Sequence, residues 1–293
     1  MEQNDRFRFF HVCTDGTVLP WMFKDSLDFI AGINRIGVCK IVSKASVYAY
    51  SLMDNHVHFL LYGEITMCKI FIDRYKTLTG KWILHKYGIH GHIKELPTSI
   101  IPIKTNESVL ETAAYIDRNS IIAGFKGLPS DYPWGSSYLM FRNDAQSIVR
   151  HRYIKDFSGY ELRNMMKTRV SLPADWRIFE NGMIDPACFT EYHKMESLFS
   201  SPIRYLYFLT KKLEGKIDLT ISSDGQKAFI PDKELRLFTE KLSLQLFGTE
   251  NIRSLNVNAR LTIARKLRRE YASTTKQISR MVYLDSEMLK GFV

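Results

Sequence analysis

Two histidines, His56 and His58, lie one residue apart in an apolar stretch that follows the turn-like residues 53–55. In a β-strand, residues i and i+2 point to the same face, so both imidazoles project together while Val57 points into packing. Two imidazoles side by side on a strand form half of a divalent-metal site. A bare His-x-His pattern more often marks two histidines on a half-buried surface strand, so residues elsewhere in the chain must decide between the two readings.

A second pair of candidates, Tyr115 and Asn119, lies in a predicted helix over residues 107–122. Because they are four residues apart, they lie on one face of that helix. One interpretation is a core tyrosine beside a surface amide. The other is a nucleophile and a metal ligand presented together to His56 and His58. Two imidazoles and one amide oxygen would leave open positions on a cation, as a catalytic site requires.

The elements that must position these residues alternate between strand and helix over the first 140 or so residues, which predicts an α+β fold with an antiparallel sheet covered by helices. Asp25 is the expected cap of the first helix and Gly37 its stop signal. The aromatic, proline-containing segment 129–138 is expected to be pinned back onto this domain. The expected strands are 7–12, 38–42, one on each side of 53–55, and 100–103; the expected helices are 25–36, 67–87 and 107–122.

We expect three parts: a first domain over 1–142, a mainly helical extension and linker over 143–230, and a helical segment over 231–293. The extension has helical spacing over 160–167 and 191–213, and 222–225 is the best linker candidate. The last part contains predicted helices over 233–247, 258–271, 276–282 and 286–292. Short turns between helices are typical of a helix-turn-helix, which would place the start of the final helix against duplex DNA.

The charge of the chain favours a polyanionic partner, with nucleic acid the first candidate. The formal net charge is +10, and residues 251–293 hold nine Lys or Arg against three acids, a net of +6. A generic three-helix bundle would not need so many basic residues, so DNA binding is the favoured interpretation of this segment.

The four cysteines, Cys13, Cys39, Cys68 and Cys188, show no Cys-x-x-Cys spacing, so neither a zinc knuckle nor a redox motif is indicated. Scattered cysteines in a chain of 293 residues fit reduced intracellular thiols. The polar N-terminus lacks a signal-peptide core, and no apolar run approaches the ~20 residues of a membrane helix. We therefore expect a cytoplasmic protein, beside the chromosome of a bacterium, with no membrane partner.

Three stretches of the chain resemble the IS200-like transposases, and within them the REP-associated tyrosine transposases, which are HUH single-strand nucleases. The matching stretches are 48–61, 115–124 and 131–138, and they occur in the order of the family. Members of this group also carry a basic helix-turn-helix tail, which 258–292 is similar to. The resemblance implies an HUH nuclease-like fold for the first domain.

The resemblance also implies the site. The metal-binding histidines of the family fall on His56 and His58, the nucleophilic tyrosine on Tyr115, and the helical amide ligand on Asn119. The implied reaction is attack of Tyr115 on single-stranded DNA near a hairpin, giving a 5′-phosphotyrosine and a free 3′-hydroxyl, which allows cutting and rejoining in DNA transposition. Such a donor set suits Mn²⁺, or Mg²⁺ with retained waters.

The chain departs from the family pattern at three places. Asp54 stands where the family usually has Pro, and Ser120 follows Asn119 where the family has Asn-Pro. Residues 95–97 replace a Gly-Arg-Phe-like stretch, so an arginine that contributes to phosphate binding is missing there. None of these differences removes a proposed catalytic group.

Two other classes stay open from the sequence: a non-catalytic DNA-binding regulator derived from a transposase, and a metal-dependent hydrolase that uses water. Monomer and homodimer are both compatible with the chain. Duplex DNA is a further expected partner of the C-terminal segment. The residues expected to bind DNA are Lys69, Arg74, Lys76, Arg265, Arg268, Arg269, Lys276, Arg280 and Lys290.

Overall fold

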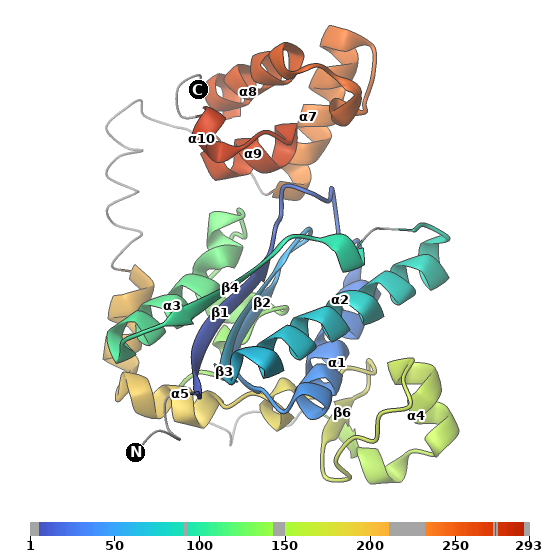
Figure 1. Cartoon of the computed structure of the whole chain (residues 1–293), viewed down its shortest axis with the longest axis vertical. Helices are drawn as coiled ribbons and strands as arrows, with labels where there is room; N and C mark the ends of the chain where they lie inside the picture. Colours follow the sequence, from blue (N-terminus) through green and yellow to red (C-terminus); the bar gives the residue numbers. More distant parts are fainter. Residues whose placement is uncertain are drawn as a thin grey trace.

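The first domain is built around an antiparallel four-stranded sheet (Figure 1). The structure, a computed structural model, describes residues 6–90, 93–142, 150–210, 232–271, 273 and 275–289. The strands are β1 (Arg8–Thr14), β2 (Ser46–Leu52), β3 (Val57–Gly63) and β4 (Thr98–Ile103), in the order β2-β3-β1-β4. Each pair of neighbours is antiparallel. The predicted α+β fold with an antiparallel sheet is confirmed.

Helices cover both faces of this sheet (Figure 1). On one face, Val57, Phe59 and Leu61 of β3 are buried in a core shared with α1 (Ser26–Ser43) and α2 (Ile65–Tyr87). On the other face, Leu60 is buried against α3 (Asn106–Ile122). Because side chains alternate along a strand, this arrangement also directs the histidine between Val57 and Phe59 toward α3.

The first helix is longer than the sequence predicts. Asp25 caps α1 as expected, but the helix continues past Gly37 to Ser43, so the expected strand over 38–42 is wrong. Gly37 lies within the helix, at a close contact with another segment and not at a turn. A Cβ atom there would lie 2.9 Å from the ring of Trp176. The glycine therefore makes room for a side chain that is distant in sequence. From local sequence alone, such a glycine looks the same as one that ends a helix.

The segment 129–138 is pinned to the edge of the sheet, as predicted. Leu52 donates its backbone N–H to the Trp134 carbonyl at 2.9 Å, and Ser136 donates to the Tyr50 carbonyl at 2.9 Å. The Trp134 ring also stacks on Phe29, with the centroids 4.8 Å apart. These contacts hold β2 in place from its free edge.

The described part of the extension contributes side chains to both hydrophobic cores of the first domain. It contains β5 (His151–Tyr153) paired with β6 (Arg177–Phe179), and α4 (Gly159–Met166) and α5 (Tyr192–Phe199). Trp176 is buried in the core with α1 and α2, whereas Phe199 is buried in the core with α3. The predicted helix over 191–213 is interrupted at Ser200, which has a left-handed backbone. The linker candidate 222–225 lies outside the described residues.

The C-terminal segment over 231–293, called the tail from here on, is helical where it is described, as predicted. It has a hydrophobic core of its own. Its helices are α7 (Asp232–Phe247), α8 (Val257–Tyr271), α9 (Thr275–Val282) and α10 (Ser286–Leu289). The core residues are Leu235, Leu242, Leu261, Ile263, Ala264, Leu267, Ile278, Met281, Val282, Leu284 and Leu289. Among the described helices of the whole chain, none is both long enough and apolar enough to cross a membrane.

Two neighbouring residues of α3 tie the extension to the first domain. The Asp117 carboxylate accepts a hydrogen bond from the Tyr205 hydroxyl at 2.7 Å. Arg118 donates to the backbone carbonyls of Phe208 and Leu209, at 2.6 and 3.1 Å. Burial raises the pKa of Asp117 to about 7, although the Tyr205 hydrogen bond works in the opposite direction. The middle of the Tyr115–Asn119 segment is therefore structural.

This buried carboxyl predicts a pH-dependent stability. Since the pKa of Asp117 is raised in the folded state, the group favours folding below its unfolded pKa of about 4, and this contribution is lost as the pH rises through about 7. Between about pH 5 and about pH 8, the unfolding free energy of the unmodified protein should fall by about 2 kcal/mol more than that of Asp117→Asn. Denaturant titrations at both pH values measure the difference, and identical pH profiles would contradict a protonated Asp117.

Candidate functional site

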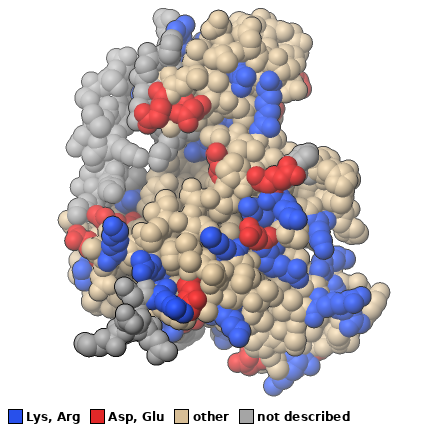
Figure 2. Space-filling view, viewed as in Figure 1, with Lys and Arg blue, Asp and Glu red and all other residues tan. Residues whose placement is uncertain are grey.

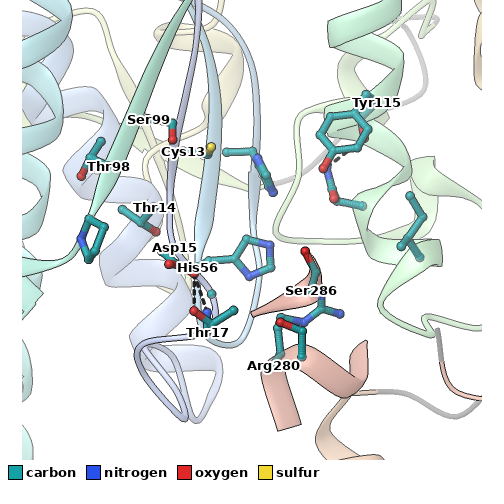
Figure 3. A pocket seen from close by; sticks show the side chains of 16 residues that line it. Cys13, Thr14, Asp15, Thr17, His56, Thr98, Ser99, Tyr115, Arg280 and Ser286 are labelled. Carbon is teal, nitrogen blue, oxygen red and sulfur yellow. Dashed lines mark hydrogen bonds between the residues drawn. The ribbon is translucent and has the colours of Figure 1, made fainter. Parts of the chain in front are cut away.

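One pocket of about 380 Å³ collects all four residues proposed for catalysis: His56, His58, Tyr115 and Asn119 (Figure 3). His56 directly precedes β3 and His58 lies at the start of that strand, whereas the tyrosine and amide come from α3. The rings of His56 and His58 have centroids 4.9 Å apart, and those of His58 and Tyr115 are 5.6 Å apart. The structure thus brings together two pairs of residues that are separated by about sixty positions in the sequence.

Two further residues of this pocket region, His11 and Cys13, lie on β1 and were not singled out from the sequence. Cys13 is the direct partner of His58 in the antiparallel pairing of β1 with β3. His11 lies two residues earlier, on the same face. Its Nε2 atom is 3.0 Å from Nδ1 of His58, and the two rings stack. The signal available in the sequence was a histidine in the predicted strand 7–12 and a cysteine two positions later, directly after that strand.

The side chains of His11, Cys13 and His58 could hold a metal ion. One ligand atom from each, two imidazole nitrogens and the Cys13 sulfur, all lie within 4.8 Å of one another. Burial lowers the pKa of His11 to about 4, so its imidazole is neutral near neutral pH, the form that binds metals. Burial also raises the pKa of the Cys13 thiol, so this group has to lose a proton to become a thiolate ligand.

The orientation of His56 is fixed by its neighbour Asn55. The Asn55 amide nitrogen donates to the Gly16 carbonyl at 2.8 Å, so the other amide atom, Oδ1, faces His56. Oδ1 can only accept, and it lies 2.8 Å from Nδ1 of His56, which must therefore carry the proton. This leaves the lone pair of His56 on Nε2, where a cation could be bound.

Gly16 allows the turn after β1 to approach the pocket closely. A Cβ atom at this position would lie 2.9 Å from Nδ1 of His56 and 3.2 Å from Cδ of Arg280. A larger residue would therefore displace the imidazole or the arginine. The glycine is buried and its importance comes from this contact, not from an unusual backbone conformation.

Tyr115 occupies an environment that opposes ionisation. Burial raises the pKa of its phenol, and nearby Cys13 raises it further. The positive charges of Arg280 and Arg118 lower this pKa in part, as does a hydrogen bond with Asn119. Further positive charge in the pocket would therefore favour ionisation of Tyr115.

Asn119 can present an oxygen to a cation. Its amide nitrogen donates to the carbonyl of Tyr115 at 2.9 Å, one helical turn back. Since the amide nitrogen donates, Oδ1 is the Asn119 atom that could bind a cation. Asn119 is 7% exposed and lines the pocket.

The tail closes one side of the pocket. Ser279 and Arg280 of α9 and Ser286 of α10 line it, and Figure 3 shows Arg280 and Ser286 reaching toward His56. Arg280 is held by Asp232, with Nη2 and Nε 2.6 and 2.9 Å from the same carboxylate oxygen. The expected DNA-binding residue Arg280 therefore belongs to the same pocket as Tyr115.

Asp232 also connects the tail to the helix of the nucleophile candidate. Its backbone N–H donates to the carbonyl of Ala123, at the end of α3, at 2.9 Å. Gln277 donates to its second carboxylate oxygen at 3.0 Å. One residue thus links the end of α3, the start of α7 and the pocket side of α9.

The basic residues expected to bind DNA on α2 lie in three different environments. Lys69 is exposed, and Arg74 is half-buried. Lys76 is buried, and its ammonium donates to the Leu96 carbonyl at 3.1 Å and to the Thr98 hydroxyl at 3.0 Å. Lys76 therefore joins α2 to the start of β4, and its expected role as a surface contact for DNA is corrected to a structural one.

The basic residues of the tail are only partly gathered on a surface. Arg265 and Arg268 are exposed on α8, and Arg268 also donates to the carbonyl of Ser273 at 2.9 Å. On the face seen in Figure 2, Lys and Arg are spread over the molecule with acidic side chains between them. Three expected contacts lie outside what the structure describes, namely the side chains of Arg269 and Lys276 and the whole of Lys290.

No family model, no curated protein and no solved structure matches this chain. Function must therefore be inferred from the pocket and from the motifs of the sequence.

We expect the ion pair between Arg280 and Asp232 to stabilise α9 at the pocket. Arg280→Gln leaves a buried carboxylate with fewer donors, which typically costs 1–3 kcal/mol, so amide exchange in α9 should accelerate by about tenfold or more. Hydrogen–deuterium exchange on the full chain measures this. Asp232→Asn should have a similar effect, and the double variant should be no worse than either.

The matched control is Arg265→Gln, at an exposed position of the neighbouring helix α8. It should leave exchange in α9 unchanged. Equal exchange in α9 for Arg280→Gln and Arg265→Gln would mean that the ion pair does not hold the tail at the pocket.

Proposed function

We propose that this chain is a metal-dependent tyrosine transposase, a single-strand DNA endonuclease that cuts and rejoins DNA near hairpin repeats. The observation that carries the proposal is a single pocket lined by Tyr115, His56, His58 and Asn119. These are the positions on which the functional residues fall in the resemblance to REP-associated tyrosine transposases. The net charge of +10 supports a nucleic-acid partner.

The residues of the pocket fit a divalent cation, Mg²⁺ or Mn²⁺. Nε2 of His56, one nitrogen of His58 and Oδ1 of Asn119 would hold it, because the Asn55 hydrogen bonds put the lone pair of His56 on Nε2 and the Asn119 nitrogen donates to Tyr115. When bound, the cation would supply positive charge to the scissile phosphate and its developing transition state. Two imidazoles and one amide leave coordination positions open for the phosphate and water.

Tyr115 is the proposed nucleophile. Its phenolic oxygen would form a bond to phosphorus as the bond to the 3′-oxygen of the preceding nucleotide breaks, and its proton would be lost to solvent. The products are a 5′-phosphotyrosine and a 3′-hydroxyl. Because one phosphodiester replaces another, rejoining needs no nucleotide hydrolysis.

Arg280 is the proposed phosphate contact of the pocket. Its guanidinium is oriented by Asp232 through Nε and Nη2, so Nη1 takes no part in that pair. A guanidinium is well suited to phosphate oxygens because it offers several donors in a fixed plane. The positive charge of Arg280 also lowers the pKa of Tyr115. The tail therefore serves the reaction directly, in addition to any contact that Arg265 and Arg268 make with duplex DNA.

A non-catalytic DNA-binding regulator is the second candidate function. The observation that favours it is that the tail lines the pocket and that the Arg280 guanidinium pairs with the Asp232 carboxylate. Such a regulator would bind hairpin DNA but form no covalent product, so a test of covalency separates the two functions.

The covalent step predicts a protein–DNA adduct that depends on Tyr115. Full-length protein incubated with end-labelled single-stranded hairpin DNA and Mn²⁺ should give a band that is shifted on a denaturing gel and removed by protease. Tyr115→Phe should give none, because it lacks the attacking oxygen. The matched control Tyr62→Phe, on β3 away from the pocket, should retain the adduct. An adduct in Tyr115→Phe would exclude this nucleophile, and cleavage without any adduct would indicate water as the nucleophile.

The metal assignment predicts a role for Asn55, which fixes His56 but would not touch the cation. Asn55→Ala should weaken Mn²⁺ binding by about 10–100-fold, the usual cost of losing a group that orients a metal-binding histidine. His56→Ala should weaken it more, and His151→Ala, an exposed histidine of β5, should leave it unchanged. Titrations followed by electron paramagnetic resonance measure the affinities. Unaltered Mn²⁺ affinity in His56→Ala would place the cation elsewhere.

A further inference from the structure

The face of the sheet under α3 offers a second way to bind a cation, with different chemistry from the proposed catalytic site. Cys13 and His58 face each other across β1 and β3, and His11 lies beside them on β1. Their three ligand atoms are within 4.8 Å of one another. Neither His56 nor Asn119 belongs to this group.

The donor set selects the class of metal. Two imidazole nitrogens and a thiolate suit Zn²⁺ or Co²⁺, whereas Mg²⁺ prefers hard oxygen ligands. Tetrahedral Zn²⁺ with Zn–N bonds of about 2.0–2.1 Å needs its two nitrogens about 3.4 Å apart. Nε2 of His11 and Nδ1 of His58 are 3.0 Å apart, so the rings need to separate by only a few tenths of an ångström. Three protein ligands would leave a fourth position open, as in catalytic rather than structural zinc sites.

His58 makes this arrangement incompatible with the proposed catalytic one. A neutral imidazole has one lone pair, on whichever nitrogen lacks the proton. Nδ1 of His58 is the atom that faces His11. If Nδ1 binds Zn²⁺, Nε2 carries the proton and cannot bind a second cation. One His58 side chain can therefore serve one cation at a time.

We propose that His11, Cys13 and His58 form a zinc-type site, and that occupation of this site withdraws His58 from the Mg²⁺ or Mn²⁺ site. Binding releases the proton of the Cys13 thiol to solvent and produces no redox change. The first half of the proposal concerns binding alone. The second half, inhibition of cleavage by Zn²⁺, rests on the proposed function.

Binding is tested on the full chain with the metals alone. Competition with a chromophoric chelator should show one Zn²⁺ per chain, and Co²⁺ should give a thiolate-to-metal charge-transfer band. Cys13→Ser should lose the band and bind Zn²⁺ at least about tenfold more weakly, since loss of a ligand costs at least as much as loss of an orienting partner. The matched control Cys188→Ser, a half-buried cysteine of the extension, should retain both within about twofold.

The binding half would be overturned if Cys13→Ser bound Zn²⁺ as tightly as the unmodified protein, or if Cys188→Ser lost the site instead. His11→Gln provides the same test if Cys13→Ser does not fold, which thermal melting of the apo-proteins reveals. His56→Ala should keep its Zn²⁺ affinity within about twofold. Loss of Zn²⁺ binding in His56→Ala would mean that the cation uses the proposed catalytic ligands, which also overturns the proposal.

Inhibition is tested by adding Zn²⁺ to a Mn²⁺-supported nicking reaction. Zn²⁺ should inhibit the unmodified protein, and Cys13→Ser should need about tenfold more Zn²⁺ to lose half of its own activity. If nicking continues at the same rate when the zinc site is saturated, the two cations do not exclude each other, and the second half of the proposal is overturned. If the protein binds Zn²⁺ but never nicks DNA, the proposed function is rejected and the zinc site is supported. If it nicks DNA but does not bind Zn²⁺, the zinc site is rejected and the proposed function is supported.

Discussion

The antiparallel pairing of β1 with β3 decides which side chains meet in the pocket. It sets Cys13 directly opposite His58, and the alternation along each strand then places His11 and His58 on the face covered by α3. A slip of one residue would send these side chains into the apolar core beside α1 and α2 and would expose Val57 and Phe59 to the pocket. Since Val57 and Phe59 are fully buried, hydrophobic packing on one face fixes the chemistry of the other.

A second constraint comes from the tail, which has its own core but does not stand apart from the first domain. Asp232 receives hydrogen bonds from Gln277 and Arg280 and itself donates to Ala123. The end of α3 and the arginine of the pocket are therefore held by the same residue. This geometry differs from a simple division of the chain into a domain that holds the site and a separate tail, because Arg280 and Ser286 line the same pocket as Tyr115.

Much of the secondary structure could be predicted because its signals are local. The cap at Asp25 and the helices of the tail follow from side chains that act within one turn. The candidate pairs His56/His58 and Tyr115/Asn119 were also visible, since spacings of two and four specify a shared face in a strand and in a helix. The local signal at Gly37 was misleading, because the glycine there accommodates Trp176, a residue far along the chain.

The remaining features could not be predicted because they depend on contacts between distant segments. The approach of His11 to His58 depends on strand register, the tautomer of His56 on the turn at Gly16, and the burial of Lys76 on the position of Leu96 and Thr98. Arg280 could be assigned to DNA binding from charge alone, but not to the same pocket as Tyr115. In that pocket, burial raises the pKa of the Tyr115 phenol, and the positive charges of Arg280 and Arg118 lower it in part. Under the proposed function, a phosphodiester with its accompanying cation would bring complementary charges: the anion would pair with Arg280, and the cation would favour the phenolate form of Tyr115.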